Sequence, residues 1–504
     1  METIDYWIEK RAEITPHREA LVHGDKRWSY YELNESIYKM AVHLKDQFNI
    51  EAQDRIAILS NNRAEYLMAY MALAKLGAIV VPLNIRLTAN ELAFQIIDSG
   101  SKALIYEGEF SDMKDEIVTL SEIESAYSLD RWEEDETQTL PTNLTPPSDI
   151  TSQSPFVICY TSGTTGRPKG AVLTHDNMYW NAINNITAID ITSHDRIIVL
   201  LPLFHIGGIG LFAFPGIVAG ATSVIIGKFD TEQAIRTIEE EKISIVMGVP
   251  AIHDAVRKTS SFNTADFLSV RWFYNGGAPC PSDVYNAYLD KGLPFGGGFG
   301  MTEASPTIFM LSKEDYIEKR GSIGKPVLYC DAKLIDDSGK EVERGEVGEL
   351  ILKGPNIMKE YWKLPDETEN TFKDGWLLTG DLMRQDEDGF FWVAGRKKDM
   401  IISGGENIYP LEVEQVIESL PEVDEVAVVG TVDPKWGEVP SAFISFHDGK
   451  ALTSEEITAF CIQRIGKYKI PKYFYEVDEL PRNATGKIAK TLLSPDAYAD
   501  KLLV

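Results

Sequence analysis

Short apolar runs alternate with helical stretches over the first half of the chain. "RIAILSNN" (55–62), "LGAIVVPLN" (76–84) and "KALIYEG" (102–108) are separated by segments with helical periodicity. A strand, a helix and a further strand in this order predict parallel pairing, with the helix crossing over the sheet. The same rhythm continues in four later runs, at 197–204, 222–228, 243–250 and 270–277. The pattern therefore predicts an α/β fold with two doubly wound sheets.

The pattern changes in three other regions. The acidic stretch at 119–154, rich in Pro, Ser and Thr, predicts a surface connection. Short strands and turn residues after 320 predict antiparallel β structure or a small β-barrel. A mixed α+β tail follows, and the Gly- and charge-rich "GRKKDMIISGGENIYP" (395–410) is typical of a joint. We therefore expect a large N-terminal domain of residues 1–395 and a small C-terminal domain of residues 396–504.

One segment has the length of a membrane span. "IGGIGLFAFPGIVAGATSVIIG" (206–227) carries no charge and could cross a bilayer. It also contains six glycines and Pro215, and the strand–helix rhythm continues on both sides. We interpret it as a buried helix followed by a buried strand, with no transmembrane segment.

Composition narrows the classes of protein. The 504 residues carry a formal net charge of −28, which argues against a nucleic-acid partner. Four cysteines lie far apart without a CxxC pair, which fits neither a disulfide scaffold nor a zinc site. The N-terminal "METIDYWIEKRAE" lacks the apolar core of a signal peptide. Reduced thiols and this N-terminus favour a cytoplasmic protein.

The first candidate for chemistry is "SGTTGRPKG" (162–170), which follows the strand-like "SPFVICY". Glycines let the backbone approach a ligand closely, and exposed N–H groups and hydroxyls suit phosphate oxygens. Lys169 adds a cation, but Gly170 follows it, so the stretch is not a Walker A motif. Alone, such a loop could equally be a flexible turn. Its residue types favour binding of a polyphosphate.

Further motifs follow in a fixed order. "GGGFGMTEASP" (296–306) places Thr302 and Glu303 in a glycine-rich turn, and "WLLTGDL" (376–382) places Asp381 in a turn after a strand. "GRKKD" (395–399) and "PRNATGKIAK" (481–490) supply Arg396 and Lys487. Each alone has an ordinary structural explanation, such as a capped turn or a solvated charge run. Together, in this order, the motifs are much more specific for one type of protein than any of them is alone.

In this order the motifs resemble the adenylate-forming superfamily of acyl-CoA synthetases, firefly luciferase and peptide-synthetase adenylation domains. The resemblance covers essentially the whole chain, and the fatty-acid–CoA ligase branch is the nearest. It implies ATP and Mg²⁺ as cofactors and coenzyme A as co-substrate. A carboxylate would attack the α-phosphorus of ATP, giving acyl-AMP and pyrophosphate. The CoA thiol would then take the acyl group and release AMP.

The resemblance also implies roles for individual residues. The phosphate loop would comprise Thr161, Ser162, Gly163, Thr164, Thr165, Gly166 and Lys169. Other ATP contacts would be Gly277, Ala278, Gly298, Phe299, Gly300, Thr302, Asp381 and Arg396, the last two on the ribose hydroxyls. Glu303 would bind Mg²⁺, and Lys487 would be a mobile catalytic lysine, with Thr302 and His205 as further catalytic residues.

The second step would use other residues. Lys398 matches the hinge about which the C-terminal domain rotates, and the CoA arm would then meet Ser403, Gly404 and Gly405. The acyl group would bind at His205, Gly276, Gly277 and Gly298. A buried histidine with its hydrogen bonds satisfied is an equal alternative for His205. The partners are thus a small-molecule carboxylic acid, ATP and CoA, and the chain could act as a homodimer.

The identity of the acid is the least determined point. The expected acyl segments are apolar and rich in small residues, which favours an uncharged tail such as a medium- or long-chain fatty acid. An aromatic acid such as o-succinylbenzoate is the alternative. Other hypotheses are a stand-alone adenylation enzyme that loads a carrier protein, a luciferase-like oxygenase and a non-catalytic relative. The last would be expected to lack Lys487 or Glu303, and both are present.

Overall fold

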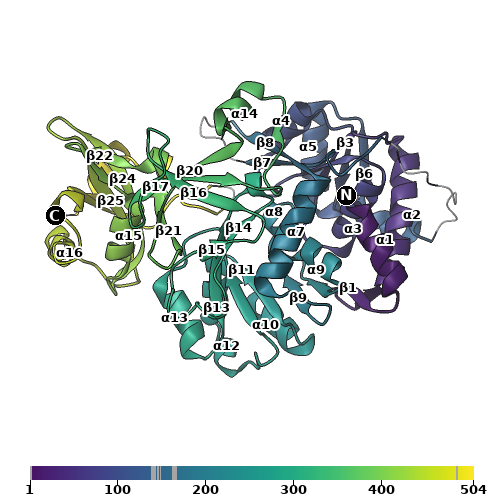
Figure 1. Cartoon of the computed structure of the whole chain (residues 1–504), viewed down its shortest axis with the longest axis horizontal. Helices are drawn as coiled ribbons and strands as arrows, with labels where there is room; N and C mark the ends of the chain where they lie inside the picture. Colours follow the sequence, from purple (N-terminus) through teal and green to yellow (C-terminus); the bar gives the residue numbers. More distant parts are fainter. Residues whose placement is uncertain are drawn as a thin grey trace. The chain divides into compact units, whose positions relative to one another are not determined.

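The computed structural model describes residues 3–137, 144, 147, 149–161, 167–483 and 486–503. The chain divides into two compact units (Figure 1). The first comprises Met1–Asp331 and Leu352–Leu377, and the second comprises Ala332–Ile351 and Leu378–Val504. Two β segments that precede residue 395 therefore belong to the second unit. The boundary predicted at residue 395 marks the start of the part that is expected to rotate during the reaction, and it stays a prediction.

The first unit contains a nine-stranded sheet in the order β15-β14-β13-β12-β11-β9-β10-β1-β2. The pairs from β13 to β1 are parallel, and the pairs at both ends are antiparallel. The strands are β1 (Glu19–His23), β2 (Lys26–Ser29), β9 (Arg196–Val199), β10 (Thr222–Ile225), β11 (Ile245–Gly248), β12 (Trp272–Asn275), β13 (Phe295–Gly300), β14 (Thr307–Met310) and β15 (Lys325–Pro326).

A seven-stranded sheet in the order β18-β8-β7-β4-β3-β5-β6 completes this unit. Its pairs from β7 to β6 are parallel, and β8 and β18 add antiparallel strands. The strands are β3 (Arg55–Leu59), β4 (Ile79–Pro82), β5 (Ala103–Tyr106), β6 (Ser125–Ser128), β7 (Pro155–Thr161), β8 (Lys169–Thr174) and β18 (Glu360–Tyr361). The apolar runs at 55–62, 76–84 and 102–108 are thus neighbouring strands, as predicted.

Helices cover and separate the two sheets (Figure 1). Helices α3 (Ala64–Lys75) and α7 (His175–Ile189) each contact strands of both sheets, and every residue of α3 is buried. The other α-helices of this unit are α1 (Asp5–Ile14), α2 (Tyr30–Phe48), α4 (Ala89–Ser99), α5 (Ser111–Ser121), α6 (Trp132–Asp135), α8 (Ile206–Gly208), α9 (Phe214–Ala219), α10 (Thr231–Glu240), α11 (Pro250–Arg257), α12 (Ser260–Thr264), α13 (Ser282–Asp290) and α14 (Pro365–Thr371). A helix between two sheets needs apolar residues all round, which explains the composition of α3.

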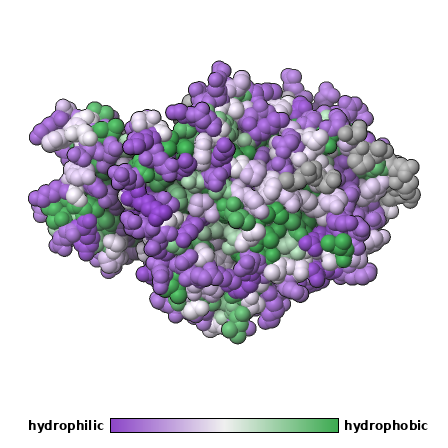
Figure 2. Space-filling model, viewed as in Figure 1, coloured by the Kyte–Doolittle hydropathy of each residue, from purple (hydrophilic) through white to green (hydrophobic). Residues whose placement is uncertain are grey.

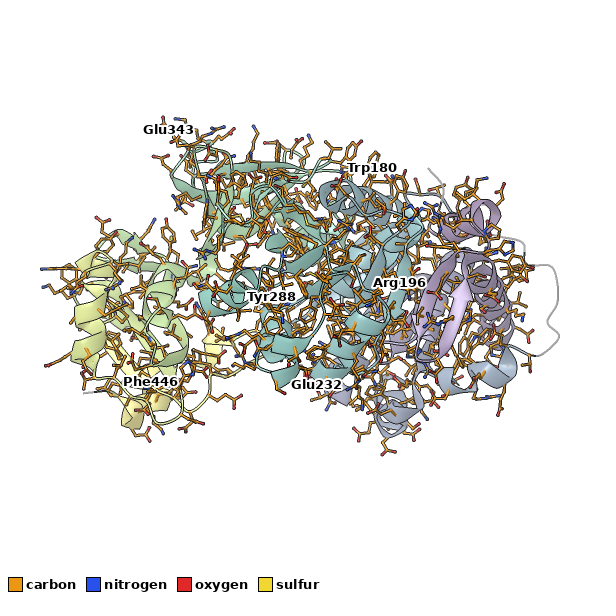
Figure 3. The ribbon with its side chains drawn as sticks, turned by 90° about the horizontal axis from the view of Figure 1, so that it is seen from below. Trp180, Arg196, Glu232, Tyr288, Glu343 and Phe446 are labelled. Atoms are coloured by element: carbon orange, nitrogen blue, oxygen red, sulfur yellow. The ribbon has the colours of Figure 1, made fainter. Side chains whose placement is uncertain are left out.

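Apolar residues from α10, α11 and α13 pack on one face of the nine-stranded sheet. Tyr288 of α13, labelled in Figure 3, is completely buried in this core beside Phe273 and Phe295. On the face of the molecule seen in Figure 2, hydrophilic side chains predominate and hydrophobic areas are smaller. This distribution is typical of a chain that buries its apolar runs in its sheets.

The uncharged segment 206–227 forms α8, a π-helical turn at Ile209–Ala213, α9 and β10. Its large apolar side chains are buried except for the half-buried Leu211 and Val218, so the interpretation as a buried helix followed by a buried strand is confirmed. Within the described part of the chain, no helix combines the length and the apolar character needed to cross a membrane.

Two predictions of local structure in the first unit were wrong. The stretch at 119–154 was expected to be only a connection, but it contributes the edge strand β6 and helix α6. Both are four residues long, too short to show a period. The glycine run at 296–300 was expected to be a turn, but it belongs to β13. Its glycines fit a strand because large neighbours lie where side chains would project, such as the Trp272 ring beside Gly296.

Five strands between residues 331 and 396 form a separate sheet in the order β16-β17-β20-β19, with β21 paired to β20. The strands are β16 (Asp331–Ile335), β17 (Val347–Lys353), β19 (Phe372–Lys373), β20 (Trp376–Gln385) and β21 (Phe391–Arg396). The predicted antiparallel region is therefore present. Asp381 was expected in a turn after a strand but lies inside β20, where Gly380 with φ +69° bends the chain.

The C-terminal part is the predicted α+β tail. Its sheet has the order β23-β22-β25-β24, and β26 pairs with β25. The elements are β22 (Ile401–Ser403), β23 (Glu406–Ile408), α15 (Pro410–Glu418), β24 (Val423–Asp433), β25 (Gly437–Phe446), α16 (Ser454–Cys461) and β26 (Tyr473–Glu476). Both helices pack on this sheet around buried residues such as Val413, Ile444 and Ile457.

Candidate active site

Three groups of predicted site residues follow parallel strands of the nine-stranded sheet. His205 comes after β9, Gly276 directly after β12, and Thr302 shortly after β13. The carboxyl ends of parallel strands meet at one edge of a sheet, where ligands of open α/β folds bind. The topology therefore gathers the predicted acyl, adenine and metal segments at one edge of the first unit.

Glu303 lies in a short 3₁₀ turn, Thr302–Ala304, and is only 8% exposed. Its Oε1 accepts a hydrogen bond from the Tyr361 hydroxyl at 2.8 Å, and its backbone carbonyl accepts one from the Met358 N–H at 2.8 Å. The carboxylate is thus oriented by a residue of β18, far away in sequence. Tyr361 was not among the predicted site residues, and its only signal was an aromatic pair in "KEYW" (359–362).

Tyr361 also links Glu303 to the predicted phosphate loop. Lys169 Nζ lies 5.5 Å from the centre of the Tyr361 ring and forms an ion pair with Glu367. The Lys169 side chain is 14% exposed. Cation and carboxylate therefore meet the same tyrosine, an arrangement suited to a ligand that carries both phosphates and a metal ion.

Thr161 ends β7 and pairs with Lys169 of β8, where its hydroxyl donates to the Lys169 carbonyl at 3.4 Å. The other predicted loop residues, Ser162, Gly163, Thr164, Thr165 and Gly166, lie outside the described residues. The two strands that flank the loop are therefore described, and they place its ends next to each other.

Glu303 is a candidate ligand for Mg²⁺. In the described part of the chain, no three His, Cys, Asp or Glu side chains come together in a way that could hold a metal ion. Mg²⁺ commonly takes one or two carboxylates and completes its shell with waters and substrate phosphates. A single oriented carboxylate near a lysine fits an ion that arrives with a nucleotide, with Glu303 as its protein ligand.

The glycines of β13 allow close packing of the backbone. A Cβ on Gly298 would collide with the Tyr274 hydroxyl and lie 2.6 Å from the Phe309 carbonyl oxygen. A Cβ on Gly300 would collide with the carbonyl of Pro306. Gly297 differs, because its nearest neighbour would be the Asn275 carbonyl at 3.6 Å. The space on the Cβ side of Gly298 and Gly300 is therefore filled by protein atoms, and the role of these glycines in binding an acyl chain stays a prediction.

Among the remaining predicted contacts, Gly276 is buried, and its N–H donates to the Gly248 carbonyl at 3.3 Å. Gly277, with φ +88°, and Ala278 are exposed after β12. The Phe299 ring is partly buried and lies 6.3 Å from Phe309 in an edge-on arrangement. An accessible backbone beside an aromatic ring suits a planar base.

His205 is exposed, so the alternative of a buried, satisfied histidine is wrong. It precedes α8, and its Nδ1 accepts a hydrogen bond from the Gly207 N–H at 3.0 Å. In a neutral ring this bond leaves the proton on Nε2. Nε2 is then a hydrogen-bond donor, the type of group that contacts a carboxylate.

Buried asparagines tie the His205 segment to the Glu303 segment. Asn181 of α7, completely buried, donates to the Gly210 carbonyl at 2.6 Å and accepts from the Thr307 N–H at 3.0 Å. Gly210 lies in the π-helical turn, where a Cβ would be 2.6 Å from the Ser305 carbonyl. Asn356, also completely buried, donates to the carbonyls of Ala304 and Thr307. These contacts fix both segments without a charged group.

The predicted ribose pair lies in the second unit. Asp381 of β20 and Arg396 of β21 face each other across antiparallel strands, with Arg396 Nε 2.7 Å from Asp381 Oδ1. The Asp381 side chain is 4% exposed and that of Arg396 45%. The pair presents an acceptor and a donor side by side, which is the chemistry that adjacent hydroxyls need.

The predicted hinge and CoA segments are also described. Lys398 is exposed in the 3₁₀ turn Lys397–Asp399. Ser403, Gly404 and Gly405 form the end of β22 and the two-residue turn to β23, with φ +60° and +92° at the glycines. A Cβ on Gly404 would lie 2.8 Å from the ring of Trp436, which is 47% exposed. This exposed ring beside the predicted CoA segment was missed; its only signal was the turn sequence "DPKWG" (433–437).

Lys487 is exposed near the C-terminal end of the second unit. Its backbone exchanges hydrogen bonds with Asn483: the Lys487 N–H donates to Asn483 Oδ1 at 3.0 Å, and its carbonyl accepts from the Asn483 N–H at 2.8 Å. The residues 484 and 485 between them lie outside the described residues. These bonds hold the backbone of Lys487 against that of Asn483, and the catalytic role of Lys487 stays a prediction.

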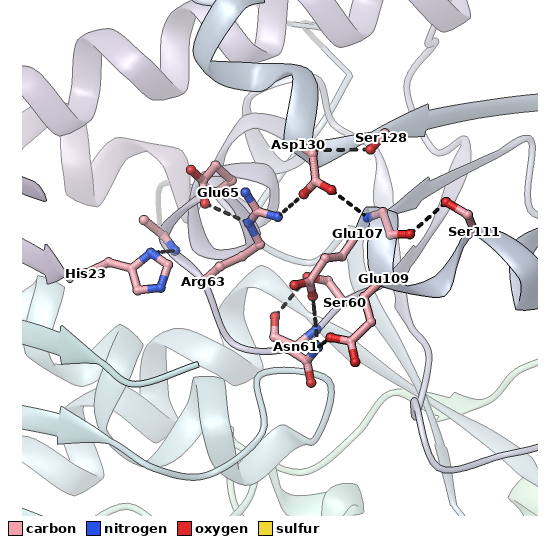
Figure 4. A network of polar contacts seen from close by, with 12 residues as sticks. His23, Ser60, Asn61, Arg63, Glu65, Glu107, Glu109, Ser111, Ser128 and Asp130 are labelled. Carbon is pink, nitrogen blue, oxygen red and sulfur yellow. Dashed lines mark hydrogen bonds and ion pairs between the residues drawn. The ribbon is translucent and has the colours of Figure 1, made fainter. Parts of the chain in front are cut away.

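A further polar cluster lies away from these motifs, beyond the carboxyl ends of β3 and β5 (Figure 4). Arg63 forms ion pairs with Glu65 and Asp130, and Glu107 accepts hydrogen bonds from Ser60 and Asn61. Its charged groups have ion-pair or hydrogen-bond partners within the cluster, so we interpret it as a structural network.

The fold and this residue set together define the class of adenylate-forming enzymes. The family model described as AMP-binding enzyme matches residues 8–362, and that of the AMP-binding enzyme C-terminal domain matches residues 412–487. The chain therefore belongs to the AMP-binding enzyme family.

Similar proteins agree with this class. The chain is 38% identical to a feruloyl-CoA synthase of Amycolatopsis sp. over 96% of this chain and 97% of that protein. It is 34% identical to the long-chain-fatty-acid–CoA ligase FadD13 of Mycobacterium tuberculosis, with 98% of each chain covered. The structure of o-succinylbenzoate coenzyme A synthetase (MenE) from Bacillus subtilis, in complex with ATP and magnesium ion, superposes with a TM-score of 0.88 at 35% identity, covering 97% of this chain and 98% of that one.

These matches confirm the resemblance inferred from the motifs. The enzyme is an acid–thiol ligase, and ATP, Mg²⁺ and CoA are the small molecules of its family. The predicted fold class, a large N-terminal α/β part with a small C-terminal α+β part, is confirmed as well. The roles of individual residues stay predictions.

Proposed function

We propose that the chain is an AMP-forming CoA ligase for an aromatic carboxylic acid. Adenylation joins the acid to the α-phosphate of ATP and releases pyrophosphate, and the CoA thiol then displaces AMP. The observation that carries the choice of acid is the packing at the sheet edge. Gly298, Gly300 and Gly210 have protein atoms where side chains would project, so their small size does not by itself make room for a long chain.

The residues that border the edge suit a flat, apolar group. Tyr274 and Phe212 lie 6.5 Å apart in an edge-on arrangement, and Met247 has its terminal methyl close to Gly276. Aromatic rings favour such edge and face contacts, and methionine adapts to irregular apolar surfaces. His205 would donate to the carboxylate oxygen of the acid.

In this proposal each predicted residue acts on a stated group. Glu303, oriented by Tyr361, holds the Mg²⁺ that arrives with ATP and offsets charge on its phosphates. Lys169 contacts the β- and γ-phosphates, Thr302 the α-phosphate, and Asp381 with Arg396 the ribose hydroxyls. Lys487 supplies the cation that attracts the carboxylate to the α-phosphate. Trp436 and Ser403–Gly405 would contact CoA.

A second candidate is a medium- or long-chain fatty acid, favoured by the similarity to FadD13. The two candidates are separated by a panel of hydroxycinnamic and other aryl acids against C8 to C16 fatty acids, measured as kcat/KM for acid-dependent AMP release. We expect the best aryl acid to exceed the best fatty acid about tenfold or more, since two or three misplaced methylenes each lose about 1 kcal/mol. A fatty acid at the top of the panel would overturn the aromatic assignment.

The acceptor is tested in the same assay. Free CoA and a phosphopantetheine-loaded carrier protein share the reactive thiol, so both are supplied separately. We expect CoA to be acylated and the carrier to remain unloaded; the reverse would identify a carrier-loading enzyme. A cytoplasmic location and a homodimeric assembly are further expectations, which fractionation and light scattering test.

A further inference from the structure

An acidic side chain outside all predicted motifs lies beside the Asp381–Arg396 pair. Glu349 of β17 is 8% exposed. Its Oε1 accepts a hydrogen bond from the Gly380 N–H at 3.3 Å, and its Oε2 lies 2.9 Å from Lys397 Nζ. Gly380 directly precedes Asp381, and Lys397 directly follows Arg396. One carboxylate therefore contacts a chain neighbour of each member of the pair.

The same strand holds the Asp381 side at a second point. The Thr379 hydroxyl donates to the Leu350 carbonyl at 2.8 Å and accepts from the Asp381 N–H at 3.0 Å. Gly380 has φ +69°, a conformation that a hydrogen bond to its N–H helps to retain. Two consecutive residues of β17 thus fix the bend that directs the Asp381 carboxylate toward Arg396.

The Arg396 side is held through Lys397. Lys397 Nζ lies 2.9 Å from both Asp337 Oδ1 and Glu349 Oε2, and hydrogen bonds to Asp337 and then Glu349 raise the pKa of Lys397. The Asp337 side chain is 88% exposed and that of Glu349 10%. Exposed ion pairs contribute little, whereas a buried carboxylate needs its partners. Asp337 and Glu349 therefore allow a matched comparison of two variants. Both carboxylates contact Lys397, but only Glu349 also accepts a hydrogen bond from Gly380.

We propose that Glu349 is a positioning residue for the nucleotide ribose, because it holds both ends of the Asp381–Arg396 pair in place for the two adjacent ribose hydroxyls. Glu349 does not touch the substrate itself. It acts through Gly380 on the acceptor and through Lys397 on the donor. This inference rests on the proposed function, in which Asp381 and Arg396 bind the ribose.

The test compares kcat/KM for ATP with kcat/KM for 3′-deoxy-ATP in acid-dependent pyrophosphate release. This ratio does not depend on the fraction of folded enzyme, so a purely structural role would leave it unchanged. We expect Glu349→Gln to lower the ratio about tenfold or more, as loss of a hydrogen bond to a charged group does. Asp337→Asn, the matched control, should keep the ratio within about twofold, and Glu349→Asp should recover part of it.

Each outcome decides a separate point. A wild-type ratio in Glu349→Gln, together with a collapsed ratio in Asp381→Asn, overturns the role of Glu349 and leaves the proposed function intact. A wild-type ratio in Asp381→Asn overturns the ribose assignment and the role of Glu349 with it. If Glu349→Gln does not fold, Lys397→Met removes the other end of the contact and should lower the ratio in the same direction; an unchanged ratio there overturns the proposal.

Discussion

The two units hold their candidate residues in different ways. In the first unit, Glu303 is buried against a tyrosine hydroxyl, and completely buried Asn181 and Asn356 fix the neighbouring backbone with neutral hydrogen bonds. In the second unit, the Arg396 side chain is 45% exposed, and Lys398 and Lys487 are exposed. Neutral buried contacts are insensitive to salt, whereas exposed charges are screened. The first unit is thus built as a fixed frame, and the second presents charges that gain strength only when solvent is excluded.

The largest effect is expected from the exposed lysine of the second unit. Lys487→Ala should lower acid-dependent pyrophosphate release by about 10²–10³, the effect of losing one group that stabilises charge in a transition state. Supplied acyl-AMP should still react with CoA. Lys490→Ala is the control. Lys490 lies on the same segment as Lys487, but its side chain forms an ion pair with Glu414 of α15 at 2.6 Å. Equal loss in both half-reactions would refute a role confined to adenylation.

A buried carboxylate of the first unit should give the next largest effect. Glu303→Gln keeps the hydrogen bond from Tyr361 but removes the negative charge, so the Mg²⁺ concentration for half-maximal adenylation should rise. We expect a shift of about 10- to 100-fold, and a smaller one for Tyr361→Phe, which only releases the carboxylate. Thermal unfolding serves as the check on stability. A Mg²⁺ titration like that of the parent would show that the metal ligand lies elsewhere.

The hinge predicted at Lys398, which lies within the second unit, is tested by Lys398→Pro. Proline fixes φ and restricts the preceding residue, so rotation about this position should be hindered. We expect CoA transfer to slow about tenfold or more, equivalent to about 1.4 kcal/mol of barrier, with acyl-AMP formation retained. Lys398→Ala, which removes only the charge, should support both steps. Slowing of adenylation to the same extent as transfer would place the hinge at another residue.

The packing of the first unit gives a smaller effect, measured as stability. Gly298→Ala should lower the free energy of unfolding by about 1–3 kcal/mol, because its Cβ meets the Phe309 carbonyl. Gly297→Ala should change it by less than about 0.5 kcal/mol, since its neighbour is 3.6 Å away. Urea unfolding of the two variants decides it. Similar losses of stability in both variants would show that contact of the new Cβ does not explain the effect.

A fall in pH should destabilise the first unit more than the second. Burial lowers the pKa of His175 to about 3 and that of His253 to about 4, below the usual value of 6.5. Between pH 6.5 and about 4 the unfolded chain binds protons that the folded one excludes, so the free energy of unfolding falls as pH falls. Only His447, 53% exposed, lies in the second unit.

Hydrogen exchange at pH 7 and pH 5, followed by peptide, measures this difference. Peptides around His175 and His253 should lose protection first, and those of β24 and β25 later. His253→Gln should reduce the pH dependence of the first unit. Equal loss of protection in both units would contradict the comparison.

The parallel strands β3, β4, β5, β7, β9, β10, β11 and β12 could be predicted from the sequence, because each is a continuous apolar run. β7, β9 and β10 needed nothing more than that pattern. The order of the motifs also identified the family, because several separate motifs in one order are more specific than any one of them alone. Strand β6 and helix α6 could not be predicted, since four residues at the edge of a sheet carry too little periodicity.

The supporting residues of the site were missed for a different reason. Tyr361 reaches Glu303 across 58 residues, and Glu349 reaches Lys397 across 48. Such contacts depend on which strands become neighbours, and no local pattern contains this information. The glycines of β13 were found but misinterpreted: in the sequence a glycine is an empty position, whereas here Trp272 and Tyr274 occupy the space.

The central claim is an AMP-forming ligation of an aromatic acid to CoA. It is tested most directly by quantifying nucleotides and thioester after incubating the enzyme with ATP, Mg²⁺, CoA and ferulic acid as the probe. We predict equal amounts of AMP, pyrophosphate and CoA thioester, and no AMP when the acid is omitted. Formation of ADP and phosphate, or AMP release that does not depend on the acid, would contradict it.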